Sequence, residues 1–293
     1  MNVEMAYLLG MVLGNGTIQR GDNRSRITID IPHKNIWTDD GLEAKIYVQA
    51  SLHDIRDIIG PLIGAELDSY REEHSTKISF EKNNNDYLMR EIFRMLGWGV
   101  RHQTMEFSDE LFTMTRDEIK SFVRGFADVT GYIRKSNIAF GKKGAHRVYI
   151  EIPTNWDMVI GLANLLKSID VPVQTIDFGH PNFRDSKLKK YNEGKRNYWK
   201  KEHQLKIWAN EFMPIGFNIR HKQEALERLS GELLEVMDPE KTHKFYWQRQ
   251  TGGKKEKPIH PEEEENDESL PLCIRGKHFN KWQELADTLG YHE

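Results

Sequence analysis

The feature that most constrains the fold of this 293-residue chain is an internal repeat. An apolar helical stretch, Met5 to Leu13, ends in Gly-Asn-Gly and runs directly into Thr17-Ile18. A second stretch, Ile119 to Ala127, ends in Asp-Val-Thr-Gly and runs directly into Tyr132-Ile133. A unit that occurs twice in the same order predicts two copies of one supersecondary structure packed against each other.

The same succession of patterns follows each apolar helix. Period-two alternation predicts two extended stretches, a 3.6-residue period then predicts a helix, and another strand pair and a closing helix follow. In the first half the segments are Arg24–Ile31, Glu43–Ala50, Leu52–Ile63, Lys77–Phe80 and Tyr87–Leu96. In the second half they are Ile138–Phe140, Arg147–Ile152, Trp156–Ile169, Leu205–Trp208 and Lys222–Val236. We therefore predict an α+β fold of two pseudo-symmetric αββαββα repeats with antiparallel sheets. The first repeat is residues 1–112, the second is 113–237, and 238–293 form a linker and C-terminal extension.

Alternation along the predicted strands gives each sheet a core face and an outward face. With Ile27, Ile29 and Ile31 in the core, polar side chains of neighbouring positions point outward. The same reasoning on three strands gives this outward set: Arg24, Arg26, Thr28, Asp30, Lys45, Tyr47, Gln49, Lys200, Gln204 and Lys206. Arg, Lys, Gln and Thr are side chains that hydrogen-bond base edges and phosphates. The alternative is an ordinary half-exposed sheet that shows a polar face to water.

Charge and composition restrict the class of protein. Residues 187–206 hold eight basic residues against Glu193 and Glu202, which suits a phosphate backbone or, alternatively, a solvated loop. No window approaches 18 uncharged apolar residues, so we expect neither a membrane span nor a signal peptide. Cys273 is the single cysteine, which excludes an internal disulfide and fits a reducing, intracellular setting.

The two helix ends resemble the nine-residue motif of the LAGLIDADG homing-endonuclease family. The matching residues are LLGMVLGNG at 8–16 and VRGFADVTG at 123–131, and the resemblance covers roughly residues 1–237. It implies that the two motif helices pack along a pseudo-twofold axis and that the two sheets form a saddle over the DNA major groove. Gly10 and Gly14 lie on one helical face and would allow the close approach of a second helix, whereas Gly125 is followed by Val129.

The resemblance also locates the residues that would cut DNA. In active members the eighth motif position is an acid in both repeats, and the carboxylates hold Mg²⁺ near the scissile phosphates. This chain has Asn15 and Thr130 at those positions, which puts double-strand cleavage in doubt. Asn15 remains a weak metal ligand, as does Asp128, which lies two residues before Thr130 and about 200° around the helix from it. Lys77 and Lys206 stand where the family often keeps a basic residue near the cut, or they contact phosphates.

The resemblance therefore predicts a sequence-preferring double-stranded DNA-binding protein with lost or much reduced cleavage, requiring Mg²⁺ only if active. The alternatives are an active or nicking homing endonuclease and an RNA-splicing maturase that binds structured RNA. We expect a monomer in the cytoplasm or nucleoid, without a membrane partner. Further predicted DNA contacts on the second repeat are Arg134, Lys135, Asn137, Arg147 and Tyr149.

Overall fold

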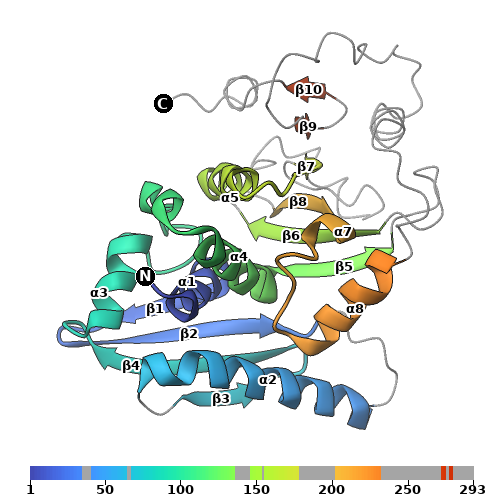
Figure 1. Cartoon of the computed structure of the whole chain (residues 1–293). Coiled ribbons are helices and arrows are strands. Elements are labelled where there is room, and N and C mark those ends of the chain that lie inside the picture. The colour runs from blue at the N-terminus through green and yellow to red at the C-terminus, as the bar shows by residue number, and fades with distance from the viewer. Residues whose placement is uncertain are drawn as a thin grey trace, which may run out of the picture.

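The computed structural model of the chain describes residues 1–34, 41–64, 67–135, 146–153, 155–177, 202–231, 272–274 and 277–279. Within them, the first repeat folds as helix, hairpin, helix, hairpin and helix (Figure 1). Its elements are α1 (Val3–Asn15), β1 (Gly16–Arg20), β2 (Arg24–Pro32), α2 (Gly41–Ile63), β3 (Asp68–Arg71), β4 (Ser75–Asn83) and α3 (Tyr87–Leu96). A short 3-10 helix, η1 (Asp109–Thr113), leads into the second repeat.

The second repeat has the same order with one extra helical turn before its last helix. Its elements are α4 (Arg116–Thr130), β5 (Gly131–Lys135), β6 (His146–Pro153), α5 (Trp156–Ser168), β7 (Thr175–Asp177), β8 (Glu202–Trp208), α7 (Ala209–Phe212) and α8 (Arg220–Gly231). The two four-stranded antiparallel sheets have matching strand orders, β1-β2-β4-β3 and β5-β6-β8-β7. The predicted α+β fold of two αββαββα repeats is confirmed.

One predicted strand of the first repeat is wrong. The stretch Glu43–Ala50 is part of the helix α2, and the strand that forms the first hairpin with β2 is β1. The buried side chains of α2 recur every three or four residues, which is the helical period: Val48, Ser51, Ile55, Ile59 and Ile63. The apparent alternation of the upstream residues was misleading because Ile46 is 57% exposed in the helix and does not enter the core.

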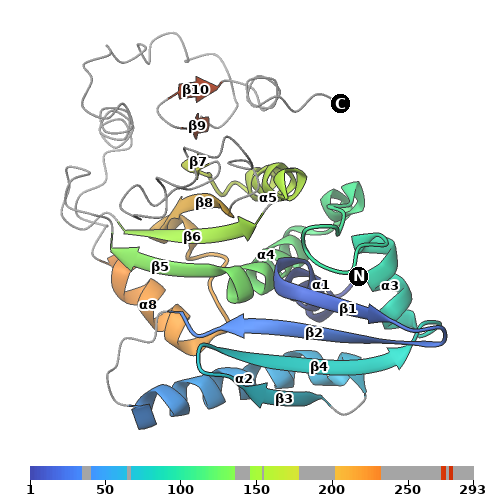
Figure 2. The same cartoon turned by 180° about the vertical axis from the view of Figure 1, so that it is seen from behind.

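The predicted faces of β2 are confirmed. Ile27, Ile29 and Ile31 are buried, while the residues between them are partly exposed on the other face. In β8, Leu205 and Ile207 are likewise fully buried. Figure 2 shows β1, β2, β4 and β3 in front with α2 behind them, so the helices cover the core face and leave the outward face of the first sheet open.

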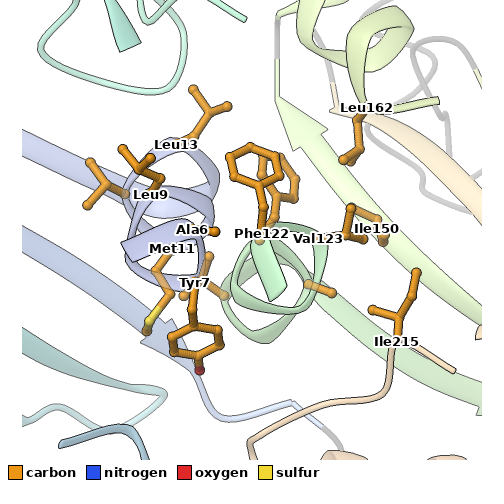
Figure 3. Packing of buried hydrophobic residues seen from close by; sticks show 14 of the residues in the cluster. Ala6, Tyr7, Leu9, Met11, Leu13, Phe122, Val123, Ile150, Leu162 and Ile215 are labelled. Atoms are coloured by element: carbon orange, nitrogen blue, oxygen red, sulfur yellow. The ribbon is translucent and has the colours of Figure 1, made fainter. Parts of the chain in front are cut away.

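The two motif helices pack against each other at two glycines. A Cβ atom on Gly10 would lie 2.0 Å from the Phe122 carbonyl oxygen, and one on Gly125 would lie 2.1 Å from the Tyr7 carbonyl oxygen. Glycine at both places lets the backbones approach to a distance that any side chain would prevent. Figure 3 shows α1 and α4 side by side at the centre of the core, with Ala6 of α1 lying next to α4. The equivalence of the two contacts is the pseudo-twofold relation expected from the repeat.

The C-terminal extension is described only in part. Two short strands, β9 (Leu272–Ile274) and β10 (Lys277–Phe279), pair antiparallel, and β9 contacts β7. The basic stretch 187–201, the predicted strand Ile138–Phe140 and residues 232–236 of the predicted last helix lie outside the described residues. None of the described helices is both long and apolar enough to cross a membrane.

Candidate nucleic-acid interface

The C-terminal ends of α1 and α4 lie side by side. A Cβ atom on Gly14 would be 2.7 Å from Cγ2 of Val129 and 3.3 Å from Cγ2 of Thr130. Each helix stops in the same way, because the backbone N–H of Gly16 or Gly131 donates to the carbonyl oxygen four residues earlier and the chain then enters a strand. The ends of the two motifs, which carry Asn15 and Thr130, therefore lie next to each other, as the resemblance predicted.

The two side chains at the acid positions are turned toward the protein. The amide nitrogen Nδ2 of Asn15 donates to the backbone oxygen of Asp30 over 2.8 Å. The hydroxyl of Thr130 donates to the backbone oxygen of Phe126 over 2.6 Å, and this side chain is nearly buried. Both groups are neutral, so the helix ends gain no negative charge from these positions.

Asp128 is fully buried and its carboxylate is held by three donors. The Tyr7 hydroxyl donates to it over 2.6 Å, and the backbone N–H groups of Asn218 and Ile219 donate over 3.2 and 3.3 Å. Burial raises the pKa of Asp128 above its usual range. The carboxylate thus ties α1 and α4 to the segment before α8, and it has no exposed oxygen to offer a hydrated Mg²⁺ ion.

Lys222 supplies a positive charge at the end of α4 that sequence reasoning missed. Its ammonium donates to the backbone oxygens of Asp128 and Gly131, each over 2.7 Å, and the residue has no exposed surface. Burial lowers the pKa of Lys222, while the nearby charge of Asp128 opposes that effect. A cation is stabilised at a helix C-terminus by the helix dipole, so Lys222 caps this end electrostatically.

A pair of carboxylates flanks the helix ends at equivalent places in the two sheets. Gly16 pairs with Ile29 and Gly131 pairs with Ile150, so Asp30 and Glu151 are the corresponding next residues. Glu151 binds the ammonium of Lys34 from the first repeat over 2.5 Å and also accepts from the amide of Gln204 over 3.0 Å.

Lys34 and Glu151 were missed for different reasons. Lys34 follows β2 in a turn without periodicity, and its partner lies 117 positions away. Glu151 could have been found from the sequence, because it continues the outward alternation of Arg147 and Tyr149 along β6.

The outward face of the first sheet carries the predicted residues Arg24, Arg26, Thr28 and Asp30, which are exposed or partly exposed. Register places further outward residues beside them that were not predicted: Thr17, Gln19, Ser79 and Glu81. Lys77 of β4 also lies here, directly opposite Asp30. The first sheet therefore gathers the predicted polar residues on one accessible face.

The outward face of the second sheet is different, because its side chains are stacked on one another. Tyr132 and Tyr149 are stacked with ring centroids 5.3 Å apart, and the guanidinium of Arg134 lies 4.8 Å from the Tyr149 ring. The Arg147 guanidinium lies over the Trp208 ring at 4.3 Å. Four predicted contact residues are almost entirely buried there: Arg147, Tyr149, Gln204 and Lys206. Arg134 remains exposed.

The remaining predicted residues lie in three places. Lys45, Tyr47 and Gln49 are on the helix α2, so their expected place on a sheet is wrong. Lys135 ends β5. Asn137 and Lys200 lie outside the described residues.

The two lysines predicted near the cut, Lys77 and Lys206, are not equivalent. Lys77 is opposite Asp30, while Lys206 is opposite Tyr149, two residue pairs further along the strands from the helix ends. The position equivalent to Lys77 is occupied by Gln204. Roles for these side chains in binding or cleavage stay predictions.

Two observations identify the type of fold: the αββαββα order occurs twice, and α1 and α4 contact each other reciprocally at their glycines. The chain has a LAGLIDADG-type fold. Among solved structures, it is similar to I-DmoI in complex with DNA and Mn, at 13% identity over 76% of this chain and 97% of that chain, with a TM-score of 0.39. It is also similar to full-length DUF199/WhiA from Thermotoga maritima, at 13% identity over 83% and 65% of the two chains, with a TM-score of 0.40.

The N-terminal LAGLIDADG domain of DUF199/WhiA is a third similar structure, at 12% identity over 78% of this chain and 88% of that chain, with a TM-score of 0.38. No family model matches the chain, and no curated protein matches it. Within the described part of the chain, no group of three or more His, Cys, Asp or Glu side chains is placed to hold a metal ion.

Proposed function

We propose that this chain is a sequence-preferring double-stranded DNA-binding protein of the homing-endonuclease type, acting as a monomer inside the cell, with cleavage lost or much reduced. The outward face of the first sheet supports the binding half of this proposal. Arg24, Arg26 and Thr28 lie on neighbouring outward positions of one open strand. Side chains of these types on an accessible face are suited to hydrogen bonds with base edges and phosphates.

The proposal that cleavage is lost rests on the side chains at the two adjacent helix ends. Asn15 and Thr130 are neutral, and each donates its hydrogen bond to a backbone oxygen of the protein. Mg²⁺ in a nuclease site is held by carboxylates, which neutralise its charge and fix the attacking water. Neutral side chains that already bond within the protein are poor replacements.

The residues around the end of α4 do not fit a divalent cation. The Lys222 ammonium is bonded to two backbone oxygens at this helix end. The Asp128 carboxylate is buried and accepts hydrogen bonds from three donors. A second cation beside a buried ammonium would be repelled, since charges interact strongly where water is excluded.

A binding and cleavage experiment on one DNA tests the proposal. A duplex is first selected from a random pool by the full chain and is then incubated with the protein and Mg²⁺ or Mn²⁺. We expect a retained complex and intact strands. Cutting of both strands would support an active endonuclease, and cutting of one strand would support a nicking enzyme. Either result would contradict the proposal that cleavage is lost or much reduced.

A matched pair of variants assigns the binding to the outward face. Arg26→Gln removes an outward guanidinium, whereas Arg116→Gln removes an exposed guanidinium that is paired with Asp170. Only the first is expected to weaken binding of the selected duplex. A preference for structured RNA over the selected duplex would instead favour a role in RNA splicing.

A further inference from the structure

The outward face of the first sheet pairs opposite charges across its strands. In the register of β2 and β4, Arg26 lies opposite Glu81 and Asp30 lies opposite Lys77, with Thr28 opposite Ser79 between them. Directly opposed side chains in an antiparallel pair are close enough to interact. The face therefore carries carboxylates among the same basic groups that a DNA backbone would need.

Each basic side chain on this face holds a carboxylate in the structure. The Arg24 Nε lies 3.2 Å from Glu81, and the Arg26 Nη2 lies 3.0 Å from Asp68. The Lys77 ammonium lies 2.5 Å from Glu72, and this contact lowers the pKa of the Glu72 carboxyl. All three ion pairs retain substantial exposure to solvent, so DNA can reach them.

Because of these ion pairs, a phosphate contact costs free energy, and this cost is the same for every DNA sequence. A phosphate that takes Arg24 or Arg26 must displace a carboxylate and then lie close to its negative charge. The edge of a base can replace the hydrogen bonds that the arginine and the carboxylate lose when their ion pair opens. Arginine donates two hydrogen bonds to guanine O6 and N7, and a carboxylate accepts one from the N4 amino group of cytosine.

We propose that Glu81, Asp68 and Glu72 are specificity-determining residues, which hold the basic side chains of the first sheet away from phosphates and favour duplexes with G·C pairs at the contacted positions. This inference rests on the proposed DNA-binding function and adds how the face discriminates. Arg26 shows the arrangement most fully, because the same Nη2 that contacts Asp68 also donates to the Ser79 hydroxyl over 2.7 Å. Its guanidinium is therefore held in one orientation before DNA arrives.

The test compares affinities for a selected and an unrelated duplex. The variants are Glu81→Gln and Asp68→Asn, which remove the negative charge and keep the size of the side chain. Asp170→Asn is the matched control, since it neutralises an exposed acid that pairs with Arg116 on other elements. Circular dichroism and thermal melting check that each variant is folded.

We expect each face variant to bind the unrelated duplex about 1.5- to 5-fold more tightly, the range that a broken exposed ion pair allows. Affinity for the selected duplex should rise less or fall, so the ratio of the two affinities decreases. The control should change neither. Unchanged or weaker binding of the unrelated duplex by both face variants overturns this inference alone. Failure of the wild-type chain to bind any duplex overturns the proposed function.

Discussion

Replacing Gly10 by alanine should separate the two central helices. The added Cβ would lie 2.0 Å from the Phe122 carbonyl oxygen, against 3.4 Å or more for an ordinary contact. The oxygen belongs to the α4 backbone and cannot rotate away, so α1 and α4 must part to supply the missing distance, about 1.4 Å between 2.0 and 3.4 Å. The same crossing holds Gly125, whose own Cβ would meet the Tyr7 carbonyl oxygen.

The expected change in the free energy of unfolding combines two effects. Overpacking destabilises the fold, and the higher helix propensity of alanine partly offsets this. Forcing extra carbon into a close-packed contact costs about 1–3 kcal/mol or more, and alanine in place of a helical glycine recovers about 1 kcal/mol. Because the contact here is with backbone, the upper end of the overpacking cost applies, and we expect Gly10→Ala to lower the free energy of unfolding by about 2 kcal/mol. Gly125→Ala should behave similarly.

Urea denaturation followed by circular dichroism measures these costs. The double variant, Gly10→Ala with Gly125→Ala, should cost less than the sum of the single variants, because one separation of the helices relieves both clashes. Gly231→Ala is the control, since a Cβ there meets nothing within 4 Å. Single variants as stable as the control, or strictly additive costs, would refute this description of the helix crossing.

Three further outcomes are expected. Lys222→Met should destabilise the fold by about 3–5 kcal/mol in urea denaturation, because it removes the ammonium near buried Asp128; a cost below 1 kcal/mol would show that Lys222 does not hold the end of α4. Burial lowers the pKa of His221 to about 3 and that of His203 to about 4, so the unfolded state binds protons first and stability should fall as the pH drops below about 6.5. The loss is about 2 kcal/mol for each histidine at pH 5, and His221→Gln should reduce it; an unchanged pH dependence would contradict this assignment. Arg24→Gln and Arg26→Gln should each weaken binding of a selected duplex by about 1–3 kcal/mol in a titration if the side chain reads a base edge, and unchanged affinity of both would exclude the first sheet from the interface.

The repeat and most elements could be predicted because they depend on local patterns. The helix Tyr87–Leu96 has the bounds predicted, and β2 exceeds its prediction by one residue. The prediction failed at Glu43–Ala50, where a few alternating residues resembled a strand although they begin a 23-residue helix. Only the longer spacing of Val48, Ile55 and Ile59 distinguishes the two.

The candidate site was predictable where the motif itself carried it. The adjacent ends at Asn15 and Thr130 follow from two motif helices that cross at glycines. The contacts that surround them could not be derived, since they join residues far apart in sequence. Asp128 and Lys222 meet across 94 positions, and no local pattern indicates that a lysine of α8 would cap α4.

The most direct measurement of the central claim is the affinity of the full chain for a selected duplex and for a scrambled duplex of equal composition, with Mg²⁺ and with EDTA. Contacts from the outward face predict a preference for the selected duplex of about 10³-fold at physiological salt. They also predict that removing the metal leaves this preference unchanged. Equal affinity for the two duplexes, or a preference that disappears with EDTA, would contradict binding by a sheet face beside metal-free helix ends.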